Sequence, residues 1–187
     1  MVSAVRYLLL LCSFLFIRPE ASAQDHRWDV RFGAGSTLLT LHSRVIASVE
    51  GEVNFTLNRY FTLAGSVGAA DSDAGEFSPK ITFLRSDVGV FISPFTNQRK
   101  HDFRLGVAGS YLTVDSPARS TVTTVNGEVV HATYENERRG GFGGAVYVDH
   151  TYTVTDRVLL GLRLAARAYD NTLESNVDAL LRIGLRL

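Results

Sequence analysis

Apolar residues alternate with small, polar or charged residues in runs of about ten along most of this chain of 187 residues. A period of two is typical of β-strands that have one apolar face. Eight such runs are predicted as strands: 27–36, 46–57, 61–70, 81–92, a fifth from about 103, a sixth ending near 150, 158–168 and 177–187. No segment after residue 24 is apolar over the length of about 20 residues that a transmembrane helix needs.

The composition of the two strand faces indicates which face points outward. One face is almost purely apolar, whereas the other carries glycine, alanine and serine with arginines and acids, and both lysines lie outside the strands. A soluble periplasmic barrel that binds an apolar ligand would turn the apolar face inward. Small residues mixed with arginines instead suit a narrow lumen, and strands of about ten residues suit a tilted bilayer crossing. We therefore predict an all-β, eight-stranded, antiparallel up-and-down transmembrane β-barrel, closed because open edges in lipid leave backbone groups unpaired.

The inward face of such a barrel would carry six acidic residues and seven arginines. This set consists of Asp29, Arg31, Glu50, Glu52, Arg85, Asp87, Arg104, Asp149, Arg163, Arg167, Asp178, Arg182 and Arg186. Charges in a narrow lumen must pair or recruit water, because an unpaired buried ion is costly. The nearly matched numbers predict a structural salt-bridge network.

A hairpin between the fifth and sixth strands tests this choice of faces. Asn126-Gly127 is a strong signal for a type I′ turn. Pairing residues whose numbers sum to 253 places apolar residues opposite apolar residues, and it places Arg104 opposite Asp149 on the inner face. A register shifted by one residue would mix the two faces. The two strands are thus predicted to continue as a ribbon over residues 115–138, bent or interrupted at Pro117.

Eight strands place both termini on one side, the periplasmic side in bacterial barrels. The connections on that side would be short, at 58–60, 93–102 and 151–157. The connections at 37–44, 71–80 and 170–176, together with the ribbon, would lie outside the cell. Six aromatic residues are candidates for the girdles at the membrane interfaces: Trp28, Phe61, Phe91, Phe103, Tyr111 and Tyr152.

The first 23 residues are predicted to be a secretory signal peptide. Arg6 precedes an apolar run over residues 8–17, and Ala21-Ser22-Ala23 matches a cleavage site, so the mature barrel domain would span 24–187. A lipoprotein signal is disfavoured, because Leu11 stands before Cys12 where a small residue is needed. Cys12 is the only cysteine, which excludes a disulfide framework and a thiolate metal site.

Other function classes find little support in the sequence. Nineteen basic and nineteen acidic residues give no net charge, which argues against a nucleic-acid partner. No catalytic, cofactor-binding or metal-binding residue is predicted, since no two histidines have ligand spacing and His42-Ser43 lacks an obvious acidic partner. The glycine-rich run at 140–144 lies within a strand, where it favours tight packing or a bulge over phosphate binding.

Together with the signal peptide, these features resemble one family across the whole mature chain. The eight alternating runs and the terminal strand 177–187 resemble the small eight-stranded barrels of the outer membrane protein A and X type in Gram-negative bacteria. That resemblance implies a location in the cell outer membrane among its lipids, and no cofactor. It implies recognition of the last strand by the barrel assembly machinery, although Leu187 stands where the final residue is usually aromatic.

The resemblance also implies a function for the ribbon. The ribbon resembles the extracellular sheet of the X-type proteins, which implies adhesion or binding of an extracellular partner, and a non-enzymatic role. Some small outer-membrane barrels are enzymes that remove acyl chains from lipid A or add them. A lipid A deacylase or acyltransferase is therefore the main alternative.

Overall fold

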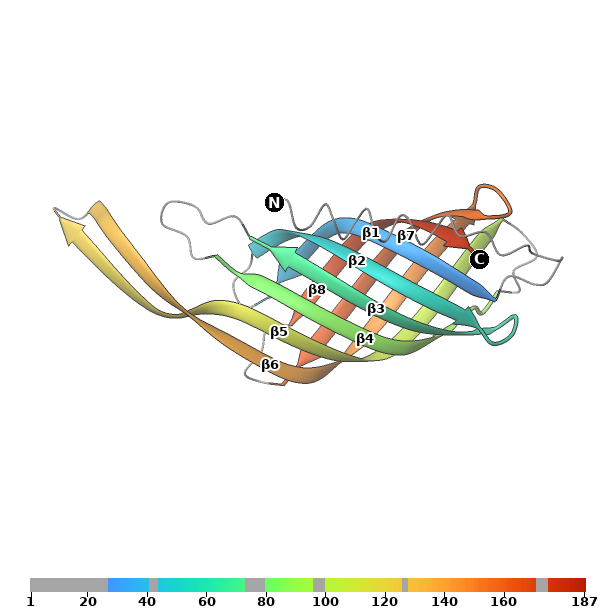
Figure 1. Cartoon of the computed structure of the whole chain (residues 1–187), viewed down its shortest axis with the longest axis horizontal. Coiled ribbons are helices and arrows are strands. Elements are labelled where there is room, and N and C mark those ends of the chain that lie inside the picture. The colour runs from blue at the N-terminus through green and yellow to red at the C-terminus, as the bar shows by residue number, and fades with distance from the viewer. Residues whose placement is uncertain (1–26, 41–43, 73–79, 96–99, 126–127, 171–174) are drawn as a thin grey trace.

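The computed structural model describes residues 27–40, 44–72, 80–95, 100–125, 128–170 and 175–187. They form eight strands: β1 (Trp28–Leu39), β2 (Arg44–Thr56), β3 (Phe61–Asp71), β4 (Thr82–Ile92), β5 (His101–Val125), β6 (Glu128–Thr153), β7 (Val158–Tyr169) and β8 (Asn176–Arg186). Neighbouring strands are antiparallel and β1 also pairs with β8, so the sheet closes in chain order (Figure 1). The predicted eight-stranded up-and-down barrel is confirmed. Over these described ranges, no helix is long and apolar enough to cross a membrane.

The register of β5 and β6 is the predicted one. Arg104 pairs with Asp149, and the sum of 253 holds from the start of β5 to Pro117, opposite Asn136. The register then shifts between Pro117 and Arg119, where proline removes a backbone donor from the ladder. The predicted turn at 126–127 and the predicted signal peptide at 1–23 lie outside the described residues.

Strands β5 and β6 form a ribbon that projects from the barrel. They contain 25 and 26 residues, whereas the other six strands contain 11 to 13. Strand β4 pairs with β5 only as far as Asp115, and β7 pairs with β6 only from Gly143. Beyond these points the two strands pair only with each other, and the ribbon leaves the barrel at the end opposite the C-terminus (Figure 1).

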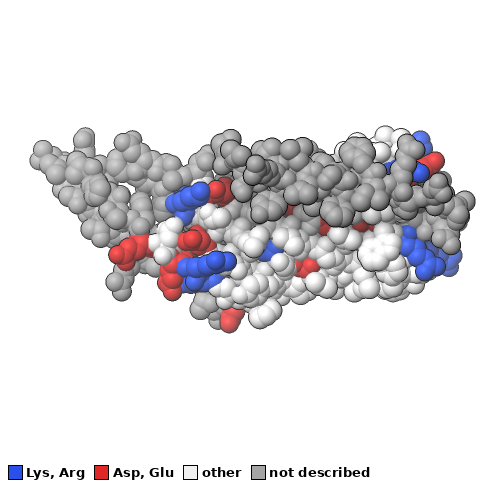
Figure 2. All heavy atoms as spheres, in the orientation of Figure 1, with Lys and Arg blue, Asp and Glu red and all other residues white. Residues whose placement is uncertain are grey.

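The outer surface of the barrel is apolar. Val88, Phe142 and Leu181 keep 75%, 79% and 73% of their surface exposed, although all three lie within strands and not in loops. Figure 2 shows a mostly white band between charged groups at the two ends of the described surface. A water-soluble barrel would bury these side chains, so the predicted inversion of the two faces is confirmed.

A layer of apolar side chains fills the lumen near the ribbon end. Leu39 and Phe83 lie there at 2% exposure, each on the same strand face as a buried arginine, Arg31 and Arg85 respectively. The complete cluster is Leu39, Ile46, Ala70, Ile81, Phe83, Leu112 and Val114, with Tyr169 packed against it. The sequence interpretation treated the inward face as small, polar or charged, and it missed this layer.

The assignment of Phe91 to an aromatic girdle was wrong. Its side chain is 2% exposed and lies in the lumen, with its ring centroid 5.3 Å from that of Tyr147. The physical reason is strand alternation, because Phe91 lies an even number of residues from the inward-pointing Arg85. Trp28, Phe61 and Tyr111 are exposed, and Phe103 and Tyr152 are half-buried.

Gly106 provides the space that the Phe91 ring occupies. A Cβ added at Gly106 would lie 2.5 Å from Cε1 of Phe91, closer than any real contact. We expect Gly106→Ala to lower the free energy of unfolding by about 1–3 kcal/mol, the usual cost of overpacking. The measurement is urea unfolding of the purified barrel in detergent.

A matched control lies three residues further along β5. A Cβ added at Gly109 would meet no atom within 4 Å, and this residue faces outward. Gly109→Ala should therefore leave the unfolding midpoint nearly unchanged. Equal shifts for the two variants would contradict the packing of Phe91 against Gly106.

Candidate functional site

The lumen holds almost all of the charged residues that the sequence assigned to it. Twelve of the thirteen are 8% exposed or less, six arginines and six acids, so their formal charges balance. Arg186 is the exception: it is half-buried at the end of β8 and donates to Thr153 Oγ1 at 3.2 Å. Strand alternation places the twelve on the inner face, because each is separated from the next inward residue of its strand by an even number of positions.

Glu50 lies where three arginines meet. Its carboxylate is 3.2 Å from the guanidinium of Arg85, 2.6 Å from that of Arg163 and 3.2 Å from that of Arg167. All four side chains are completely buried. Since Glu50 belongs to β2 and two of the arginines belong to β7, these ion pairs cross the lumen and join opposite sides of the barrel.

A second meeting point is Asp149 on β6. It pairs with Arg163 at 2.7 Å and with Arg104 and Arg182 at 3.1 Å each. Arg163 and Arg182 also reach Glu52, at 2.5 and 2.7 Å. Arg163 therefore connects three carboxylates, which is possible because its planar guanidinium presents several donors in fixed directions.

The network continues toward both ends of the lumen. On the ribbon side, Arg167 pairs with Asp178 and, at 2.9 Å, with Asp87. On the other side, Arg31 pairs with Asp29 at 2.6 Å and donates to Thr151. Asn54 joins this end to the centre, since its amide donates to Asp29 at 3.0 Å and to Glu52 at 2.7 Å.

Aromatic rings pack against the arginines of this network. The guanidinium carbons of Arg104 and Arg163 lie 5.0 and 5.1 Å from the centroid of Phe91, and those of Arg163 and Arg167 lie 4.8 and 5.2 Å from the centroid of Tyr147. The Tyr147 hydroxyl also donates to Asp87 at 2.7 Å. Cation–π contacts of this kind are favourable when the cation is desolvated.

Little space is left among these side chains. The cavity beside Glu52, Asp87 and Tyr147 has a volume of about 10 Å³, close to the minimum for one water molecule. A larger hollow of about 430 Å³ is lined mainly by exposed small or apolar residues of β6, β7 and β8, such as Gly144, Ala166 and Val177. Paired charges and aromatic rings occupy the lumen of the described barrel, which argues against a soluble barrel holding an apolar ligand inside.

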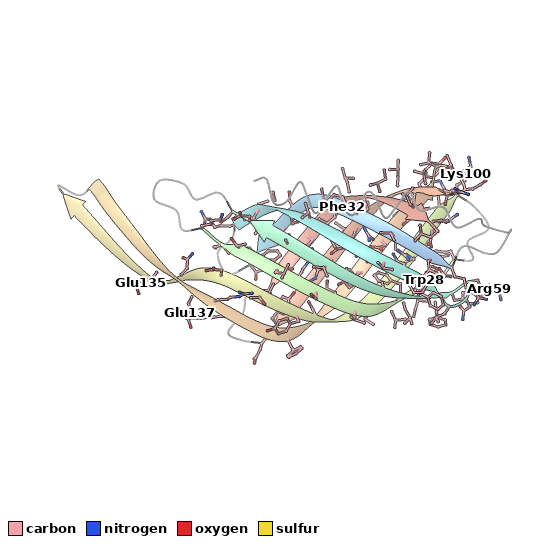
Figure 3. All side chains as sticks on the ribbon, viewed as in Figure 1. Trp28, Phe32, Arg59, Lys100, Glu135 and Glu137 are labelled. Carbon is pink, nitrogen blue, oxygen red and sulfur yellow. The ribbon has the colours of Figure 1, made fainter. Side chains whose placement is uncertain are left out.

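The described part of the ribbon carries charges of both signs at its base. Glu135, Glu137, Arg138 and Arg139 are exposed, and Figure 3 shows the first two beyond the barrel, at the opposite end from Trp28, Arg59 and Lys100. Arg139 donates to Glu137 at 2.7 Å, and this hydrogen bond, together with the attraction between the charges, lowers the pKa of the Glu137 carboxyl.

The structure brings into contact two histidines for which the sequence showed no ligand spacing. Nδ1 of His101 lies 3.2 Å from Nε2 of His150, at the barrel end that carries the short connections. The 253 register could have revealed this contact, because it makes the two residues diagonal neighbours on one face of β5 and β6. Among the residues that the structure describes, no group of three or more His, Cys, Asp or Glu side chains is placed to hold a metal ion. His42 and Ser43 lie outside the described residues.

Comparison with known proteins identifies the fold. No protein-family model and no curated protein matches the sequence. Solved structures do match. The attachment invasion locus protein Ail of Yersinia pestis matches with a TM-score of 0.59 and 8% identity, over 86% of this chain and 97% of that one. Neisserial surface protein A matches with a TM-score of 0.60 and 15% identity, over 86% of this chain and 94% of that one.

The N-terminal β-barrel domain of OprF from Pseudomonas aeruginosa is also similar, with a TM-score of 0.54 and 12% identity over 85% of this chain and 97% of that one. This chain has the fold of the small outer-membrane barrels. An apolar exterior and an interior of paired ions suit that fold to a bilayer, where lipid surrounds the barrel. A closed barrel with an apolar exterior is the form in which a β-sheet can span a membrane.

Proposed function

We propose that this chain is a non-enzymatic barrel that presents the β5–β6 ribbon to the environment as a surface for interaction. The observation that carries the proposal is the length of these two strands, which extend beyond the ends of their neighbours β4 and β7. Residues 116–125 of β5 and 128–142 of β6 pair with each other and with no other strand described. Each strand therefore keeps one free edge of backbone donors and acceptors.

A free strand edge is suited to a partner that adds a strand of its own, with backbone hydrogen bonds supplying affinity. The same edge risks pairing between copies of the chain, and charged residues are a common protection against this. The exposed charges at 135, 137, 138 and 139 fit that role at the base of the ribbon. We infer a partner with an extended segment, bound outside the membrane.

Ail has also been crystallised with the heparin analogue sucrose octasulfate. For the present chain a polyanionic partner is the weaker proposal. Glu135 and Glu137 balance Arg138 and Arg139 at the base of the ribbon, so this segment offers no excess of positive charge.

The charge network in the lumen serves, in this proposal, as a structural plug. Balanced ion pairs that cross the barrel hold opposite strands together, and the apolar layer closes the ribbon end. The proposal further includes removal of residues 1–23, periplasmic termini, and recognition of β8 by the barrel assembly machinery.

Removal of the ribbon tests the proposed function. Asp115 pairs directly with Arg138, so a two-residue Asn-Gly turn can replace residues 116–137 and leave the barrel register intact. We expect this variant to assemble normally, and cells that carry it to lose retention on surfaces coated with extracellular proteins. The measurement is the fraction of cells retained, compared with cells that carry the full chain.

Assembly is checked separately, from the shift of the unboiled band on a denaturing gel. Charge reversal at the base alone, Glu135→Lys with Glu137→Lys, serves as a variant of unchanged length. A truncated barrel that assembles and is retained as well as the full chain would contradict a role for the ribbon.

A lipid A-modifying activity is the alternative with a direct test. The two histidines whose surroundings are described, His101 and His150, contact each other, and His101 also contacts the Tyr152 ring; both lie at the end opposite the ribbon. We expect the mass spectrum of lipid A to be the same in cells with and without the protein. A mass difference of one acyl chain that depends on the protein would replace the proposed function with an enzymatic one.

A further inference from the structure

Two exposed imidazoles meet on the outer face of β5 and β6. His101 Nδ1 and His150 Nε2 are 3.2 Å apart, the ring centroids are 5.3 Å apart and the interplanar angle is 18°. In the ladder, His101 pairs with Tyr152 and Phe103 pairs with His150, so the histidines are diagonal neighbours. The contact is held by the sheet and does not depend on a flexible loop.

The surroundings support this pair and leave it accessible. The Tyr152 ring lies 4.9 Å from that of His101 and packs against its side. The adjacent acid, Asp102, has other partners. It accepts a hydrogen bond from the Ser93 hydroxyl at 3.1 Å, and its carboxylate lies 3.8 Å from the guanidinium of Arg104. Figure 3 places Lys100, the residue before His101, at the end of the barrel away from the ribbon.

From this geometry we propose that His101 and His150 bind one divalent transition-metal ion of the class that prefers imidazole, such as Cu²⁺, Ni²⁺ or Zn²⁺. An ion about 2.0–2.1 Å from each of two nitrogens 3.2 Å apart would see them at roughly 100°, a normal angle for neighbouring ligands. Water would complete the coordination shell, since the pair is exposed. Affinity should be highest for Cu²⁺, which leads the order of divalent first-row metals at nitrogen sites.

Metal binding by the two histidines releases no proton when both imidazole rings are neutral. Without metal, one ring nitrogen donates its hydrogen to the other, and both nitrogens share one hydrogen. When the ion binds, that hydrogen moves to the far nitrogen of the same ring by a change of tautomer. Both facing nitrogens then present lone pairs to the metal.

Titration with Cu²⁺ alone tests the site. The protein, without an affinity tag and with His26→Gln in every sample so that the predicted mature N-terminus (Gln24-Asp25-His26) offers no imidazole to Cu²⁺, is purified from outer membranes in detergent. Binding is followed by calorimetry and electron paramagnetic resonance. We expect one Cu²⁺ per chain, with nitrogen hyperfine structure from two imidazoles. His101→Gln and His150→Gln should each weaken binding by at least roughly tenfold, because even the loss of an outer-shell partner costs that much.

Glutamine keeps a hydrogen-bonding group at each position, so the variants separate metal binding from a simple hydrogen bond. His131→Gln, in the ribbon, removes one histidine elsewhere and should leave both affinity and spectrum unchanged. The shift of the unboiled gel band confirms that each variant retains the barrel. Equal Cu²⁺ affinity in wild type and in the His101→Gln and His150→Gln variants, or a spectrum with a single nitrogen in wild type, would overturn the proposal.

Discussion

Replacing Glu50 with Gln is expected to lower the free energy of unfolding by about 3–5 kcal/mol, the usual effect of removing one partner from a buried ion pair. Gln has nearly the same shape as Glu, so little of the loss would come from packing. The main cause is charge: Arg85, Arg163 and Arg167 all contact this carboxylate with no exposed surface. Without it, the lumen would hold six arginines and five acids.

A double variant separates the loss of charge balance from any other effect of the substitution. Arg85 contacts Glu50 at 3.2 Å and Asp178 at 2.8 Å, and it has fewer carboxylate partners than Arg163. Glu50→Gln with Arg85→Gln restores equal numbers of buried charges. We expect this double variant to be less destabilised than the sum of the two single variants.

The measurement is equilibrium unfolding in urea with the protein in lipid vesicles. Glu137→Gln breaks an exposed ion pair in the ribbon and serves as the control, for which we expect no measurable change. If Glu50→Gln unfolded at the same urea concentration as this control, the network would not stabilise the barrel.

Strand alternation and one turn were sufficient to predict the fold. Arg104 and Asp149 illustrate the reason, because opposite residues share a face and the sum of 253 expected from the Asn126-Gly127 signal is also the sum in the barrel. The ribbon between them contains two register shifts, and these cancel. In a barrel with strands in chain order, every pair of neighbouring strands except β1 and β8 is also adjacent in sequence. Local patterns therefore determine both the order of the strands and their register.

Contacts across the lumen could not be predicted in the same way. Arg163 meets Glu50 from a strand that is not its neighbour in the sheet, at a separation of 113 residues in sequence. That contact depends on the tilt and stagger of all eight strands, which no single hairpin determines. Phe91 is a different case: the alternation in β4 already placed it inside, and its aromatic character led to the wrong assignment.

The apolar outer surface of the barrel predicts a second large effect, on assembly of the barrel in the membrane. Val107 on β5 and Leu162 on β7 point outward and are 62% and 45% exposed. An arginine on the lipid-facing side near the middle of the bilayer costs about 2–4 kcal/mol, because its charge leaves water for hydrocarbon. We therefore expect Val107→Arg and Leu162→Arg each to reduce the amount of barrel that assembles, and the two together to abolish assembly.

The readout is the heat-dependent band in the outer-membrane fraction. Val107→Met and Leu162→Met lengthen or preserve the side chain without a charge, and should assemble as well as wild type. Glu135→Arg introduces the same charged group in the exposed ribbon and should also assemble. This pattern would follow only if the outer face of β5 and β7 meets lipid. Normal assembly of the double arginine variant would mean that these exposed apolar side chains face water, and the charged interior would then require another explanation.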